Sequence, residues 1–253
     1  MSRRLSQLLM VALVCVIAPL GTSDAHAHGV TLKVRHYLPA DSPFHTQFLL
    51  PWVEKMENES HGLLRFQVFP ATQIGGDPSQ LYDQVRDRAA DIVWTAVGNP
   101  AGRFPAFEVF NLPFVTHSAQ GSSRALWEYV QANDLAKKEF AGVRLLAVQV
   151  STVESNEKAS LLSAAFIFAM NSAAYKSLSD ELKKLISANS GAETSAWLGK
   201  ILDASGGGTT AAGQQRAQSA IEARIKELDE RGLNGKDLVE SAQALLAEYD
   251  PPK

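Results

Sequence analysis

Cysteine is nearly absent from this chain of 253 residues, because Cys15 is its single cysteine. Residues 1–27 have the layout of a cleavable secretory leader. Arg3 and Arg4 precede an apolar run, and Ala25-His26-Ala27 forms a small-x-small cleavage site. Removal of this leader would take Cys15 with it. The remaining residues would then contain neither a disulfide framework nor a thiol nucleophile.

An excess of charge of one sign is also missing. The chain has 24 basic and 27 acidic residues and a formal net charge of -3. Such a balance gives no electrostatic footprint for nucleic acid or for an anionic membrane, so we expect no nucleic-acid partner. After the leader, no apolar run is long enough to cross a bilayer. With 45% hydrophobic residues, the chain can bury the core of one large or two small domains.

The motifs of the common catalytic folds are not found. The sequence has no Gly-x-Ser-x-Gly elbow, no phosphate-binding loop, no Gly-x-Gly-x-x-Gly fingerprint and no His-Glu-x-x-His. Its histidines at 36, 45, 61 and 117 are scattered and have no metal-ligand spacing. We therefore expect that the chain is not an enzyme and that it binds neither a metal nor a cofactor.

Strand and helix patterns alternate between Thr31 and Val150. Alternating or continuous apolar residues predict strands over 31–37, 64–68, 91–97 and 143–150. Apolar residues at helical spacing predict helices over 44–56, after Asp77-Pro78 and over about 119–141. This order predicts right-handed crossovers and a mainly parallel sheet covered on both faces. Ligands of such sheets usually lie outside the carboxyl ends of the strands.

The remainder of the chain has a different pattern. Ala164 to Met170 is one apolar strand or buried segment, and everything after Asn171 is helical in character. Helices are expected over about 173–190, 193–204, 211–231 and 236–249. We therefore expect an N-terminal α/β lobe over 28–150 and a second part over 151–253.

Several short motifs point to a known family. They are Gln73-Ile74-Gly75-Gly76, Gly102-Arg103-Phe104-Pro105, the stretch from Phe107 to Phe114, Met170-Asn171 and Gly232-Leu233-Asn234-Gly235. In this order and spacing, the chain resembles the substrate-binding receptors of tripartite ATP-independent periplasmic (TRAP) transporters. The resemblance implies a periplasmic, two-lobed α/β binding protein. Its lobes would close on a small organic acid, often a dicarboxylate, and deliver it to the transporter's membrane subunits.

The resemblance also implies where the ligand binds. The implied contacts are Tyr37 and Leu38 after the first strand, Thr95 and Ala96 at the end of the third, and Gln73 in the loop between them. Arg103 and Phe114, in the loop over residues 102–114 that carries two of the motifs (the motif loop), complete the set. A different role is open for three of these residues. For Arg103 a structural salt bridge inside its loop is favoured over ligand contact, while Phe114 and Tyr37 would equally suit the core.

The sequence departs from the family after the fourth strand. The family continues there into a second lobe with a stretch ending in an arginine, which pairs bidentately with the ligand carboxylate. Here no arginine lies between Arg144 and Arg216. The resemblance therefore predicts a periplasmic-binding-protein-like fold with a reduced second lobe and a cleft open on one side. The alternative is a deletion remnant that has lost ligand binding and acts only as an interaction protein or not at all. Dimerisation through the C-terminal helices is a further open alternative.

Overall fold

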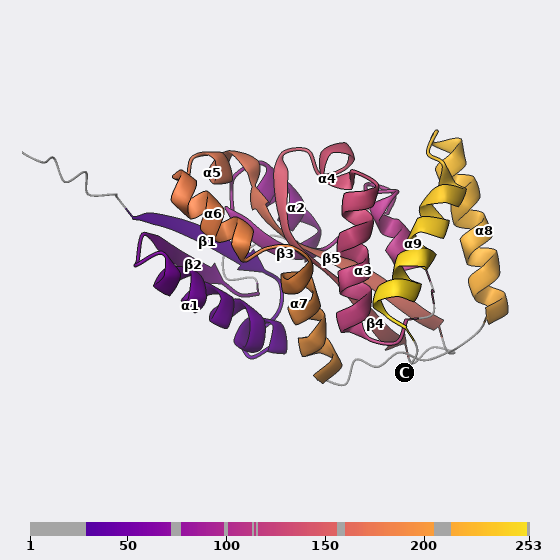
Figure 1. Cartoon of the computed structure of the whole chain (residues 1–253), viewed down its shortest axis with the longest axis horizontal. Coiled ribbons are helices and arrows are strands. Elements are labelled where there is room, and N and C mark those ends of the chain that lie inside the picture. The colour runs from indigo at the N-terminus through magenta and orange to yellow at the C-terminus, as the bar shows by residue number, and fades with distance from the viewer. Residues whose placement is uncertain are drawn as a thin grey trace, which may run out of the picture.

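A single sheet organises the part of the chain that the computed structural model describes, namely residues 29–71, 77–98, 101–112, 114, 116–155, 160–204 and 214–251 (Figure 1). Its strands are β1 (Val30–His36), β2 (Leu64–Phe69), β3 (Ile92–Ala96), β4 (Val143–Ser155) and β5 (Ser160–Asn171). They lie in the order β2-β1-β3-β5-β4. The four strands predicted between Thr31 and Val150 are thus confirmed.

The sheet is mixed, since β1 pairs in parallel with β2 and β3, whereas β5 runs antiparallel to β3 and β4. Four strands therefore share one direction, and β5 alone runs against them. The predicted apolar segment from Ala164 to Met170 is the core of β5. Its direction follows from its closeness to β4 in the sequence, because strands separated by so few residues pair antiparallel. The sheet thus combines residues from both sides of the predicted boundary at residue 150, and the division into two units stays a prediction.

Helices cover both faces of this sheet. Their bounds are η1 (Phe44–Leu49), α1 (Leu50–Glu59), η2 (Pro78–Gln80), α2 (Leu81–Arg86), η3 (Phe107–Asn111), α3 (Ala119–Ala132), α4 (Leu135–Lys138), α5 (Ser172–Lys176), α6 (Asp180–Ala188), α7 (Ala192–Ala204), α8 (Gln214–Glu230) and α9 (Gly235–Tyr249). Two predicted helices are divided. The helix expected over 119–141 breaks at Asp134, which has a φ of 54°, and that over 173–190 breaks before the N-cap Ser179. None of the described helices is both long and apolar enough to cross a membrane.

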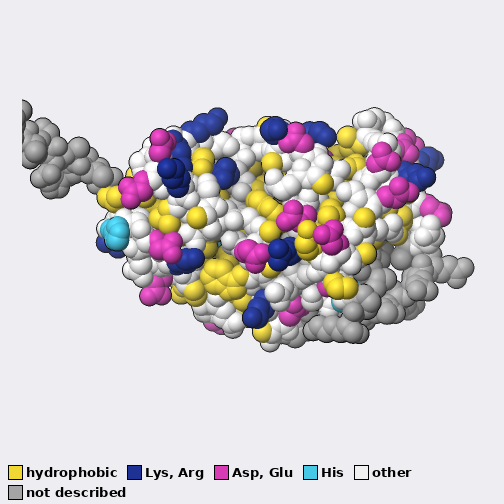
Figure 2. Space-filling model, in the orientation of Figure 1, with side chains coloured by type: hydrophobic (Ala, Val, Ile, Leu, Met, Phe, Trp, Pro, Cys, Tyr) yellow, Lys and Arg dark blue, Asp and Glu magenta, His cyan; other side chains and the backbone are white. Residues whose placement is uncertain are grey.

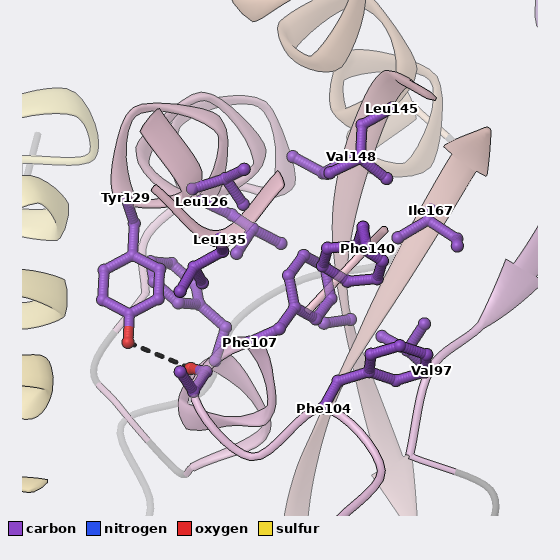
Figure 3. Packing of buried hydrophobic residues seen from close by; sticks show 14 of the residues in the cluster. Val97, Phe104, Phe107, Leu126, Tyr129, Leu135, Phe140, Leu145, Val148 and Ile167 are labelled. Atoms are coloured by element: carbon purple, nitrogen blue, oxygen red, sulfur yellow. Dashed lines mark hydrogen bonds between the residues drawn. The ribbon is translucent and has the colours of Figure 1, made fainter. Parts of the chain in front are cut away.

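Alternation along the strands produces two separate cores. Val93, Ile167 and Val148 face one side, where α2, α3 and α9 pack with the loop before α3. Val34 and Phe168 face the other side, where α1, α6 and α7 pack. Figure 3 shows part of the first core, in which the hydroxyl of Tyr129 donates to the carbonyl of Ala106 at 3.0 Å. The surface in Figure 2 carries acidic and basic side chains interspersed, as the balanced composition predicts.

The outer edge of β4 is closed by side chains. The backbone N–H of Val148 donates to the hydroxyl of Ser195 on α7 at 3.0 Å, and that of Val150 donates to the hydroxyl of Ser123 on α3 at 2.9 Å. Both serines are buried. These two donors therefore have partners, although no strand of the described residues lies beside β4 on that side.

The opposite edge, β2, is closed in the same way by α1 and the turn that follows it. The backbone N–H of Leu64 donates to the hydroxyl of Ser60 at 3.0 Å, and that of Phe66 donates to the carboxylate of Glu57 at 2.9 Å. Each edge strand is thus hydrogen-bonded to the helical layer next to it.

A close backbone contact joins α3 and α7. A Cβ placed on Gly199 of α7 would lie 2.1 Å from the carbonyl oxygen of Ala119 in α3. One turn later, the carboxylate of Asp203 accepts from the N–H groups of Ala119 and Gln120 at 2.7 and 3.0 Å. The two contacts fix the first turn of α3 on α7.

Candidate ligand-binding site

Four of the predicted contact residues lie on neighbouring strand ends. β1 and β3 pair in parallel with His36 opposite Trp94, so Tyr37 and Leu38 emerge beside Thr95 and Ala96. The structure therefore brings these four residues together at the carboxyl ends of the inner strands β1 and β3. Gln73 lies outside the described residues.

An aromatic cluster, formed by Tyr37, Phe44, Trp94 and Phe166, lies at these strand ends. Trp94 stacks on Phe44 with ring centroids 4.3 Å apart and on Phe166 at 4.7 Å, with planes 3° apart in the second pair. Tyr37 stacks on Trp94 at 5.3 Å. The indole N–H of Trp94 donates to the side-chain oxygen of Gln149 at 3.0 Å, which fixes the ring. Sequence reasoning missed Trp94 and Phe166, although Trp94 directly precedes the predicted contact Thr95.

Tyr37 is the half-buried member of this cluster. Burial raises the pKa of its phenol to about 12, so the hydroxyl stays protonated near neutral pH and can donate a hydrogen bond. Thr95 points to the other face of the strand and is buried. Ala96 lies opposite Phe166 in the strand register. The side chains at these strand ends are uncharged, so they offer ring faces and hydroxyls but no formal positive charge.

Arg103 and Phe114 each contact other side chains of the protein. The guanidinium of Arg103 donates to both carboxylate oxygens of Asp83, at 3.0 and 2.5 Å, and lies 4.4 Å from the ring centroid of Tyr82. Its hydrogen bonds lower the pKa of Asp83. Phe114 is buried and meets the edge of Phe110. These contacts fit the salt-bridge and core alternatives, and ligand contact by either residue stays a prediction.

Glu108 is the polar centre of the motif loop. Its carboxylate accepts from the backbone N–H groups of Gly102, at 2.8 Å, and Phe104, at 3.1 Å. The guanidinium of Arg224 on α8 completes the arrangement at 3.2 Å. Only 5% of the Glu108 side chain and 13% of the Arg224 side chain are exposed. The motif that carried the family resemblance therefore holds a buried ion pair, which sequence reasoning missed.

Two further side chains fasten this loop. Glu139 accepts from the N–H groups of Ala106 and Phe107 at 2.7 and 2.9 Å. The side-chain oxygen of Asn111 accepts from the N–H of Ala165 on β5 at 2.8 Å. The loop is thus attached to the sheet next to the aromatic cluster.

A buried histidine pair adjoins Tyr37. The Nε2 of His36 lies 2.8 Å from the Nδ1 of His45, and the Nδ1 of His36 is buried without a partner in the described structure. Burial, with the adjacent His45, lowers the pKa of His36 to about 4. No group of three or more metal-ligating side chains forms here or elsewhere in the described part of the chain.

We predict an acid-dependent loss of stability from His36. Its pKa is lower in the folded state than in the unfolded state, so the unfolded chain binds more protons as the pH falls from about 6.5 toward 4. Stability should fall by about 2 kcal/mol between pH 7.5 and pH 5 from this residue. Urea unfolding at the two pH values measures the loss. His36→Gln should flatten the dependence, while His61→Gln, at an exposed position, should leave it unchanged. Equal slopes in all three proteins would contradict the prediction.

The chain is similar to proteins of a known family. Residues 34–160, half of the chain, match the model of the bacterial extracellular solute-binding proteins, family 7. The outer membrane transporter protein TsaT of Comamonas testosteroni is 28% identical over 126 residues. That match covers 50% of this chain and 37% of TsaT, so it spans little more than a third of the relative's length.

Solved structures match over most of their length. A TRAP solute-binding protein from Rhodoferax ferrireducens T118, in complex with copurified benzoate, is 28% identical with a TM-score of 0.74, covering 87% of this chain and 98% of that one. A marine metagenome TRAP solute-binding protein specific for aromatic acid ligands, in complex with metahydroxyphenylacetate, is 28% identical with a TM-score of 0.77, covering 87% and 99%. The sugar acid binding protein DctPAm from Advenella mimigardefordensis, in complex with galactonate, is 14% identical with a TM-score of 0.66, covering 88% and 99%. The last match shows a common fold alone.

Proposed function

Because this chain belongs to family 7 of the bacterial extracellular solute-binding proteins, we propose that it is the periplasmic receptor of a TRAP transporter and passes a small organic acid to the membrane subunits. The family predicted from the sequence motifs is confirmed by the family model. Its members are transport binding proteins and not enzymes. Export by way of the leader at residues 1–27, which lie outside the described structure, is part of the proposal.

We further propose that the acid is aromatic. The observation that carries this step is the aromatic cluster at the ends of β1 and β3, where the half-buried ring of Tyr37 lies on Trp94. Two structural matches at 28% identity hold benzoate and metahydroxyphenylacetate. The dicarboxylate expected from the sequence is narrower than these matches support, because they hold aromatic acids and, at lower identity, sugar acids.

The affinity is expected to be modest. Stacking of a ligand ring on an aromatic side chain contributes about 0.5–1.5 kcal/mol beyond area burial. A hydrogen bond from the Tyr37 hydroxyl to the ligand carboxylate is charge-assisted and contributes about 1.5–3 kcal/mol, without the second bond that a bidentate arginine would add. With these two terms as the specific contacts, we expect a Kd near 1 mM, equivalent to about 4 kcal/mol of binding free energy.

Thermal unfolding of the purified protein with different acids tests the proposal. A ligand with a Kd of about 1 mM stabilises the folded state by about 1.4 kcal/mol at 10 mM and should raise Tm by about 3–5 °C. We expect this shift with benzoate and 3-hydroxybenzoate and a smaller one with succinate or galactonate. Tyr37→Phe should keep more of the shift than Tyr37→Leu, because only the first of these variants keeps the aromatic ring. A larger shift with succinate than with benzoate would reject the aromatic class.

The deletion remnant is the second candidate, and the hairpin of β4 and β5 favours it. Ser151 pairs with Ala164 and Ser155 with Ser160, whereas β3 ends at Ala96, opposite Phe166. The paired parts of β4 and β5 thus extend past the end of β3, in the region where the resemblance implies entry into a second lobe. A cooperative unfolding transition that no acid shifts would support the remnant. Light scattering of the same samples would show whether it forms dimers.

A further inference from the structure

A hollow lies at the other end of β4, away from the aromatic cluster. Its volume is about 380 Å³, and it opens where the first residues of β4 meet α3 and α5. Its polar and aromatic lining consists of Trp127, Gln131, Arg144, Ser172, Tyr175 and Lys176. The volume lies within the range of small-molecule sites, about 300–1,000 Å³.

Arg144 is held rigidly in this hollow. Its guanidinium lies 4.3 Å from the ring centroid of Tyr175, and its Nη2 donates to the hydroxyl of Ser187 at 3.1 Å. The Ser187 hydroxyl in turn donates to the carbonyl of Lys183 at 2.7 Å and lies 2.9 Å from the hydroxyl of Tyr175. The guanidinium is therefore oriented before any ligand arrives, which lowers the entropic cost of binding.

The two cations of the hollow lack counter-ions. Within the described ranges, no carboxylate lies within 4.0 Å of Arg144 or of Lys176, whereas Arg86, Arg103 and Arg224 each pair with at least one. The Nε of Arg144 is also buried without a hydrogen-bond partner in that part of the chain. A half-buried guanidinium normally gains an anionic partner, because its charge is costly to remove from water.

We propose that this hollow is a second binding site, in which Arg144 and Lys176 hold the carboxylate of a small acid with a planar apolar body. A planar fork of N–H donors suits a carboxylate, and the exposed ammonium of Lys176 adds a second donor. The half-buried ring of Trp127 provides an apolar wall for the body of the acid. The site goes beyond the proposed function, since it lies at the opposite end of β4 from the predicted ligand contacts.

Fluorine NMR of protein labelled with 5-fluorotryptophan separates the two sites. The chain has four tryptophans. Trp127 lines the hollow and Trp94 lies in the aromatic cluster, and a Trp→Phe substitution assigns each resonance. We expect a benzoate titration to move the Trp127 resonance saturably, with acetate and inorganic phosphate at least tenfold weaker. Arg144→Gln and Lys176→Gln should each weaken this response about tenfold. Lys226→Gln, at an exposed position of α8, removes the same charge outside the hollow and should change nothing.

Three outcomes would overturn the second site. A Trp127 resonance that stays fixed while that of Trp94 moves would reject it and leave the proposed function intact. An equal Trp127 response in all variants would show that the two cations do not hold the acid. Phosphate binding as tightly as benzoate would reject the chemical class. Lys176→Gln keeps the test valid even if Arg144→Gln unfolds the protein, because the Lys176 side chain is exposed.

Discussion

Replacing Glu108 with alanine is expected to destabilise the protein by about 3–5 kcal/mol. The carboxylate is the acceptor for two backbone N–H groups of the motif loop and the partner of Arg224. Its removal leaves the guanidinium of Arg224, whose side chain is only 13% exposed, without this partner. It also leaves the N–H groups of Gly102 and Phe104 without their acceptor. Breaking one side of a buried pair costs more than the pair contributes, because the remaining charge keeps its desolvation penalty.

Urea unfolding monitored by circular dichroism measures this loss, and Glu227→Ala is the matched control. Glu227 also pairs with Arg224, at 2.7 Å, but 40% of its side chain is exposed. Its replacement should therefore cost less than about 1 kcal/mol. The double variant Glu108→Leu with Arg224→Met should recover part of the stability lost in Glu108→Ala, since no buried charge is left unpaired. Equal losses of stability in Glu108→Ala and Glu227→Ala would show that burial of the Glu108 carboxylate does not increase its contribution to stability.

Gly199→Ala is the second substitution for which we expect a large loss, about 3 kcal/mol or more. The added methyl group would lie 2.1 Å from the carbonyl oxygen of Ala119 and 2.8 Å from the Cα of Gln120. Both are backbone atoms, so the overlap is relieved only if α3 and α7 move apart. That movement would also weaken the bonds from Asp203 to the first turn of α3. Overpacking usually costs 1–3 kcal/mol, and contact with a rigid backbone lies at the upper end of that range or above it.

The loss of stability expected for Gly199→Ala is opposite to the effect that helix propensity predicts. Alanine is favoured over glycine in a helix by about 1 kcal/mol, so propensity alone predicts stabilisation. Thermal and urea unfolding therefore distinguish the two effects directly. Lys200→Ala changes the next, exposed residue of α7 and should stay within about 0.5 kcal/mol of the original chain. A Gly199→Ala protein as stable as the original would mean that the helices separate at no cost.

The strands were predictable because a strand covered on both faces gives a short continuous apolar run, and a strand with one buried face gives alternation. The neighbours of β5 were not predictable, because periodicity along one segment contains no information about which strand pairs with it. The break at Asp134 depends on a left-handed backbone conformation, which apolar spacing does not reveal. The division before α6 follows from Ser179, which accepts from the N–H of Leu182, a signal that was present and was overlooked.

Part of the candidate site was also predictable from the sequence. Tyr37 and Thr95 lie on neighbouring strand ends because parallel strands place their carboxyl ends at one edge. The partner of Arg103 was not predictable, since Asp83 lies 20 residues earlier on a different element. The unpaired state of Arg144 was equally hidden, because it depends on which carboxylates the fold brings near. Counter-ions are set by tertiary structure, and the sequence shows only that charges of both signs are present.

The closed edges of the sheet have a consequence for how copies of this protein can associate. A free edge strand can act as a template on which a strand from another molecule adds, and natural proteins avoid this by protecting the edge. Here hydroxyls of Ser123 and Ser195 protect β4 up to Val150, and Ser60 with Glu57 protects β2. An incoming strand would have to displace these bonds before it could form its own. Along these stretches, association by continuous strand addition is therefore disfavoured, which leaves the helical surfaces as the route for pairing between copies.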